Sequence, residues 1–194
     1  MDITVYKVKL KFTEDLLGTV PKNKEIYKAF IATKAASRED AEEEVATVAE
    51  IEEKGWTGFH TDEKGPFLYD YSVKGFLCEA ARTLKQHGAL KQLMDKFKRY
   101  TFVTPRKIYL PKIAQDPNER PLRALTAQGP RVALVRSDVV PAGSRIEFQL
   151  KVLDQSGIKL PLIKEVLEYG SLMGLGQWRS GGFGRFEVES LKEV

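Results

Sequence analysis

One stretch of the sequence restricts the fold more than any other, an apolar stripe between residues 73 and 84. Its apolar residues recur at spacings of i, i+3, i+4, i+7, i+8 and i+11, and they are Val73, Phe76, Leu77, Ala80, Ala81 and Leu84. This period places all six on one face of an α-helix, and such a face must be buried against another element. Asp70 or Ser72 can cap the helix start. The stripe therefore predicts a core helix that packs on a sheet.

Strands flank this helix in the sequence, and a second strand–helix–strand unit follows. Residues 6–12 and 145–152 alternate between apolar and polar side chains, which is typical of strands with one buried face. Pro161 stands near the start of a second amphipathic helix, and residues 185–189 indicate a final strand. This order predicts an α+β fold of the ferredoxin-like (RRM-related) βαββαβ type.

Two insertions interrupt this plan. Residues 13–55 form a long connection with an acidic helix, because residues 39–53 contain eight acids and no base. Residues 107–131 contain short strands and turns, which predict a mid-chain hairpin. We expect one domain over residues 1–194 with these two insertions.

The composition excludes several classes of protein. The chain has 194 residues, of which 42% are apolar and 30% charged, so it can bury a core and is not mainly disordered. Its apolar runs are too short to span a membrane, and its polar start is not a signal peptide. One cysteine and two histidines cannot supply a Cys/His zinc site. We expect a cytoplasmic protein without metal ion, cofactor or membrane contact.

The basic residues are concentrated in the middle of the chain. The formal net charge is +4, but residues 96–145 hold eleven Lys or Arg against three acids. Such a segment attracts polyanions, of which nucleic acid is the commonest in cells. A well-solvated basic surface is the alternative interpretation.

A glycine-rich segment spans residues 174–185 and contains five glycines, two arginines and two aromatic residues. Glycines let backbone N–H groups approach an anion, arginines bind phosphate through paired donors, and aromatic rings offer faces for base stacking. It is not a P-loop, because no Gly-Lys-Ser/Thr follows. The residues expected to contact nucleic acid are Trp178, Arg179, Gly181, Gly182 and Gly184. A tight helix-to-strand connection is the alternative interpretation.

A second candidate site lies at the start of the first core helix. The unpaired N–H groups of a helix N-terminus favour an anion, and Lys74 adds positive charge there. Gly75 is a poor helix former, which indicates that another backbone approaches it closely. An ordinary helix cap with a solvated lysine explains the same residues.

Taken in order, residues 5–12, 65–77 and 174–185 resemble the RAMP superfamily of CRISPR-associated proteins, in particular its guide-RNA-binding backbone subunit. The resemblance implies a fold that grips single-stranded RNA, assembles with other subunits, often as a filament, and serves antiviral defence as a ribonucleoprotein. A stand-alone or phage-encoded relative is equally compatible. Carried over residue by residue, it places the following at the RNA backbone: Ser72, Lys74, Gly75, Arg179, Gly181, Gly182 and Gly184.

The mid-chain segment adds three arginines, Arg120, Arg123 and Arg131. Backbone subunits of this superfamily have a projecting hairpin that kinks the RNA, and the segment matches it by position. We therefore expect these arginines to lie along an RNA phosphate backbone. An arm that binds a neighbouring subunit and a plain surface hairpin are the alternative interpretations.

Catalysis is not the expected role, although some RAMP proteins cleave RNA by acid–base chemistry. His60 is the best-placed candidate, as a loop histidine near the predicted helix start. If the chain is an enzyme, it is a metal-independent endoribonuclease that uses His60. Two other hypotheses stay open: an anti-defence or interaction protein that mimics or docks onto a CRISPR subunit, and a protein that binds a small nucleotide.

Overall fold

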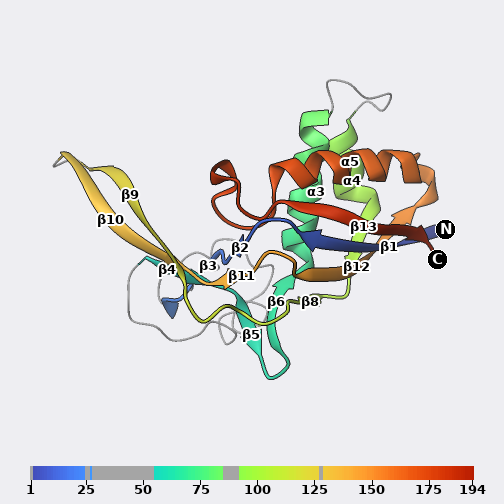
Figure 1. The fold of residues 1–194 in the computed structure, drawn as a ribbon. Helices are drawn as coiled ribbons and strands as arrows, with labels where there is room; N and C mark the ends of the chain where they lie inside the picture. The colour runs from blue at the N-terminus through green and yellow to red at the C-terminus, as the bar shows by residue number, and fades with distance from the viewer. Residues whose placement is uncertain (1, 25–26, 28–54, 85–91, 127–128) are drawn as a thin grey trace.

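The computed structural model describes residues 2–24, 27, 55–84, 92–126 and 129–194 (Figure 1). Within these ranges, the side chains of residues 122–126, 129–131 and 133 are not described. The predicted acidic helix at residues 39–53 therefore lies outside the described residues, and so do the side chains of Arg123 and Arg131.

The main sheet has four strands in the spatial order β13-β1-β12-β7. Its strands are β1 (Ile3–Phe12), β7 (Thr101–Thr104), β12 (Arg145–Leu153) and β13 (Phe186–Glu193). Every neighbouring pair is antiparallel. Numbered by their sequence order, the strands lie as 4-1-3-2, which is the ferredoxin-like arrangement. The predicted α+β fold is confirmed.

Three helices pack with this sheet, and Figure 1 shows α3 and α5 on the same side of it. They are α3 (Asp70–Leu84), α4 (Leu93–Tyr100) and α5 (Leu160–Met173). The predicted stripe of α3 is buried from Val73 to Ala81, as the periodicity requires. A Cβ at Gly170 of α5 would lie 2.4 Å from the Phe76 ring, so the two helices pack closely there.

The opposite face of the sheet carries a ladder of ion pairs. Lys7 pairs with Glu147 at 2.7 Å, and the next two lysines of β1 continue the pattern with glutamates of β13. RRM domains stack bases on aromatic side chains of this sheet face. Here the lysines and glutamates of the ladder neutralise one another.

Smaller sheets form beside the main one. Their strands are β2 (Leu16–Leu17), β3 (Val20–Pro21), β4 (Trp56–Gly58), β5 (His60–Asp62), β6 (Gly65–Tyr69), β8 (Lys107–Tyr109), β9 (Asn118–Thr126), β10 (Gly129–Ser137) and β11 (Val139–Val140). The predicted mid-chain hairpin is present as β9–β10, which projects from the body of the molecule (Figure 1). It extends to Ser137, beyond the predicted boundary at residue 131. Its strand β10 also pairs in parallel with β4, which the sequence did not indicate.

Among the described residues, no helix is both long and apolar enough to cross a membrane. The same residues contain no cluster of three or more His, Cys, Asp or Glu side chains that could hold a metal ion.

Candidate functional site

The glycine-rich loop between α5 and β13 is closely packed against itself. Gly184 has a φ of +70°, and a Cβ there would meet the carbonyl oxygen of Leu175. The Gly184 amide donates to Asp15, and the Leu175 amide donates back to Gly184. The glycines of this loop therefore have a structural role, because they let the loop fold closely on itself.

The loop amides are mostly used inside the protein. Gly181 donates to Trp178, Gly182 donates to Arg179, and Gly184 donates to Asp15. Each of these three amides therefore already has a protein acceptor, while the contact of the three glycines with RNA stays a prediction. What the loop presents to its surroundings is its side chains, chiefly Trp178, Arg179 and Arg185.

Trp178 is 40% exposed, and its ring is held by contacts within the protein. Phe183 stacks on it with ring centroids 5.1 Å apart, and the Arg120 guanidinium lies 4.7 Å from its centre. Both contacts compete with the base stacking that the sequence predicted for this ring.

Arg179 connects the loop to the first core helix. Its guanidinium donates to both carboxylate oxygens of Glu79 on α3, at 2.8 and 3.1 Å. The two segments that the sequence singled out, the start of α3 and the loop, are thus parts of one surface. The contact between them is made by Glu79, in the second half of α3.

The exposed face of α3 leads from this ion pair to the helix start. Tyr71, Gly75 and Glu79 are spaced four residues apart, so they lie along one side of the helix, and all three are exposed. No atom of the described chain beyond the helix lies within 4 Å of where a Cβ of Gly75 would be. Gly75 predicted that another backbone approaches the helix closely. No backbone in the described part of the protein does so, and the space beside Gly75 is open.

Two cavities line this face, and Thr19 borders both. One is an open hollow of about 700 Å³ that includes Glu79, Gln177, Arg179 and Arg185. The other, of about 270 Å³, includes Tyr71 and Ser72 at the start of α3. We call this continuous surface, from Tyr71 past Thr19 to Arg185, the helix–loop groove.

Lys74 lies on a different side of α3 and points into the protein. Its ammonium donates to the carbonyl oxygens of Phe97 and Thr101 and to the Thr101 hydroxyl. It caps the C-terminal end of α4, where a cation is favourable, while partial burial lowers its pKa. The prediction that Lys74 faces an RNA backbone is wrong here, because its hydrogen bonds serve the fold.

Arg120 is buried at the base of the β9–β10 hairpin, with 5% of its surface exposed. Its guanidinium donates to Asn118 and Ser137, both at 3.2 Å, besides its contact with Trp178. The expectation of an exposed phosphate-binding arginine is wrong for Arg120, which instead ties the hairpin to the glycine-rich loop.

His60 is likewise buried, and it lies on β5 rather than in a loop as the sequence predicted. A hydrogen bond of 3.1 Å links its Nε2 to the Tyr27 hydroxyl, and the rings of Phe67 and Tyr69 pack around it. Burial, with a smaller contribution from Lys107, lowers the pKa of His60 from 6.5 to about 4. The ring is therefore neutral at pH 7.

Sequence reasoning missed several residues of the groove. Thr19 lies in a loop without any motif, and Tyr71 was identified only as part of a helix start. Arg106 lines neither cavity, but its guanidinium lies 5.0 and 5.5 Å from the ring centres of Tyr69 and Tyr71 while it pairs with Asp70, and nothing in its sequence context indicates this contact. Tyr71 alone carried a signal, since it is an aromatic residue on the polar side of the predicted helix.

The fold and the groove define a ferredoxin-like α+β protein with an open, partly basic helix–loop surface. Among solved structures, one chain of the cryo-EM structure of the type III-B Cmr-beta bound to cognate target RNA is similar, with a TM-score of 0.54 and 12% sequence identity. The match covers 99% of this chain but only 61% of that chain, and at this identity it bears on the fold alone. No family model and no curated protein matches the sequence.

Proposed function

We propose that this protein is a CRISPR-associated, RAMP-type subunit that binds single-stranded RNA in the helix–loop groove. The observation that carries the proposal is the Arg179–Glu79 contact, which brings the glycine-rich loop against the open face of α3 beside Gly75. A phosphate backbone lying in the groove passes close to Arg179 and Arg185, while the missing side chain of Gly75 gives it room.

Two further points support this assignment. The similar solved chain belongs to an RNA-bound Cmr complex, so a fold of this kind occurs in such an assembly. The outward sheet face carries the ion-pair ladder on β1, β12 and β13, and Phe102 on β7 is its exposed aromatic residue among those described, so the groove is the better site than an RRM-like stacking surface.

Partner proteins are part of the proposal. The projecting β9–β10 hairpin exposes Val132 and Leu134, which lie on the same side of β10. A filament or mixed complex formed on RNA would cover such residues. The elution volume of the protein with and without a long single-stranded RNA tests this, and elution of a single protomer in both cases contradicts assembly.

RNA binding itself is tested by titrating a short labelled single-stranded RNA and following its anisotropy at several salt concentrations. We expect Arg185→Ala and Arg179→Ala each to weaken binding several-fold and to lower the slope of log K against log salt by about 0.7 for each phosphate that is no longer neutralised. The matched control is Lys164→Ala on α5, whose side chain is 66% exposed, pairs with Glu168 and lines neither cavity of the groove.

The control distinguishes a site from general attraction. A groove site predicts that Lys164→Ala leaves the affinity within about twofold, because one exposed distant charge contributes little. Equal losses of RNA affinity in all three variants would mean that binding depends only on the net charge of the protein. The groove would then not be the binding site. Absence of RNA binding by the wild-type chain would overturn the function itself.

A further inference from the structure

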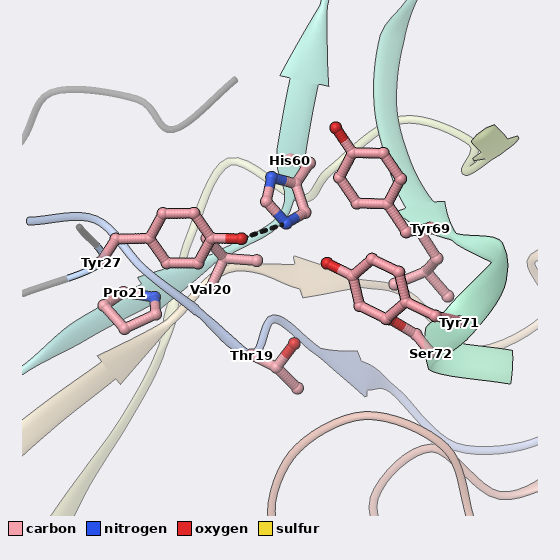
Figure 2. Close-up of a pocket in the computed structure, with 9 residues that line it drawn as sticks. Thr19, Val20, Pro21, Tyr27, His60, Tyr69, Tyr71 and Ser72 are labelled. Atoms are coloured by element: carbon pink, nitrogen blue, oxygen red, sulfur yellow. Dashed lines mark hydrogen bonds between the residues drawn. The ribbon is translucent and has the colours of Figure 1, made fainter. Parts of the chain in front are cut away.

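The smaller of the two cavities has a distinctive lining. Its volume is about 270 Å³, and its walls include Thr19, Pro21, Tyr27, His60, Tyr71 and Ser72. Figure 2 shows the hydroxyl groups of Tyr27 and Tyr71 directed toward one another from opposite sides, with His60 and Thr19 completing the ring of side chains. The lining is mostly apolar and aromatic, with hydroxyl groups at several points.

The size of this cavity restricts its occupant. Pockets for drug-sized ligands measure roughly 300 to 1,000 Å³, so a cavity slightly below that range suits a small planar group. Its described lining includes no acidic side chain, ammonium or guanidinium, and the Arg106 guanidinium that contacts the Tyr69 and Tyr71 rings is not part of that lining. His60 is neutral at pH 7 because burial lowers its pKa to about 4. A neutral, flat, partly polar group fits this chemistry better than a phosphate or a carboxylate.

The position of the cavity supplies the second argument. Thr19 borders both this cavity and the open hollow beside Arg179 and Arg185. Tyr71 stands at its rim, 44% exposed, with its ring stacked on Tyr69 at 5.2 Å. An aromatic pocket thus opens directly beside the surface along which the phosphates run.

We propose that this cavity accepts one unstacked nucleobase of the RNA bound in the helix–loop groove, with Tyr71 as its aromatic wall. The inference rests on the proposed function, since it needs an RNA strand in the groove. Single-stranded RNA is commonly held by splaying out a base and stacking it on an aromatic side chain.

The lining also sets the selectivity of this pocket. The polar groups of Thr19 and Ser72 are hydroxyls, and each hydroxyl can donate or accept a hydrogen bond, whereas the Tyr27 hydroxyl is already bonded to His60. Such groups adapt to the edge of any base. The pocket therefore requires a base but tolerates all four, in contrast to a site built from fixed donors and acceptors.

The test compares two RNAs of equal phosphate number, oligouridine and an oligomer of the same length whose sugars lack bases. For the wild-type chain we expect the abasic oligomer to bind more weakly, by about fivefold or more for one stacked base. Tyr71→Leu removes the ring and should bring the affinity for oligouridine down to that for the abasic oligomer, with the latter unchanged. Tyr71→Phe keeps the ring and should restore the difference.

Each other outcome overturns the inference in a recognisable way. Tight and equal binding of both RNAs by the wild-type chain refutes the base pocket but leaves the groove as an RNA site. Binding of neither RNA refutes the proposed function as well. If Tyr71→Leu weakens both RNAs alike, or lowers the melting temperature in parallel, Tyr71 has only a structural role. Tighter binding of uridine monophosphate than of oligouridine would make a free nucleotide the ligand.

Discussion

The guanidinium of Arg179 spans both carboxylate oxygens of Glu79, with contacts of 2.8 and 3.1 Å. This pair holds the glycine-rich loop against α3, and it also neutralises a cation at the centre of the proposed RNA surface. The side chains are 33% and 47% exposed, so the pair is close to water and can exchange partners at little cost. A phosphate that enters the groove competes with Glu79 for Arg179.

This competition predicts that Glu79→Gln strengthens RNA binding. The substitution removes a negative charge and releases the Arg179 donors, so we expect a several-fold higher affinity and a steeper salt dependence. The free energy of unfolding should change by less than about 1 kcal/mol, because exposed ion pairs contribute little to stability. Anisotropy titrations and thermal melts measure the two effects.

Glu168→Gln is the matched control for this charge change. Glu168 pairs with Lys164 on α5 and is 60% exposed, so its removal alters the net charge equally but outside the groove. If both variants bind RNA more tightly by the same factor, the gain comes from net charge, and Arg179 does not contact phosphate.

Gly75→Ala is expected to have opposite effects on stability and on binding. Alanine in an exposed helix position is more stable than glycine by roughly 0.5 to 1 kcal/mol, and no described atom beyond the helix lies within 4 Å of its Cβ. An RNA backbone that approaches the helix closely would lose this room, so the affinity should fall. A variant that is more stable and binds RNA as well as wild type shows that the strand does not pass Gly75.

The sequence predicted the parts of this fold that repeat with a regular period. The stripe on α3 and the alternation in β1 and β12 are long enough to define a buried face, and all three elements are present. The parallel pairing of β4 with β10 joins two residues of each strand, far too few to leave a pattern in the sequence.

The site was predicted less completely, because side-chain direction depends on tertiary packing. Lys74 and Arg120 were assigned to RNA from their charge, yet both point inward and bond to groups that other elements provide. Thr19 and Tyr71 line the smaller cavity together only because the chain around β3 folds beside the start of α3. The loop does contact α3, through the Arg179–Glu79 pair, a contact that neither residue's sequence context indicates.

His60 should make stability depend on pH in a defined window. Its pKa is about 4 in the folded protein and 6.5 in an unfolded chain, so the unfolded state binds the extra proton first. Stability should therefore be complete above pH 6.5 and fall as the pH drops toward 4, by up to about 3 kcal/mol. Urea unfolding at several pH values measures this, and His60→Gln should remove most of the change between pH 6.5 and 4. An equal slope in the variant would assign the effect to other groups.

Two glycines of the loop should respond very differently to alanine. Gly184 and Gly182 both have positive φ, at +70° and +90°, so a Cβ strains either position by about 1–2 kcal/mol. A Cβ at Gly184 would also overlap the carbonyl oxygen of Leu175, whereas at Gly182 the one described atom within range is the Arg185 guanidinium carbon at 4.0 Å. Gly184→Ala should therefore cost about 3 kcal/mol or more and weaken RNA binding, because the loop must open to relieve the overlap. Gly182→Ala should cost about 1–2 kcal/mol and keep the loop closed. Urea unfolding of the two variants, each paired with an RNA titration, separates these effects, and equal destabilisation would show that the packing of Leu175 against Gly184 does not hold the loop.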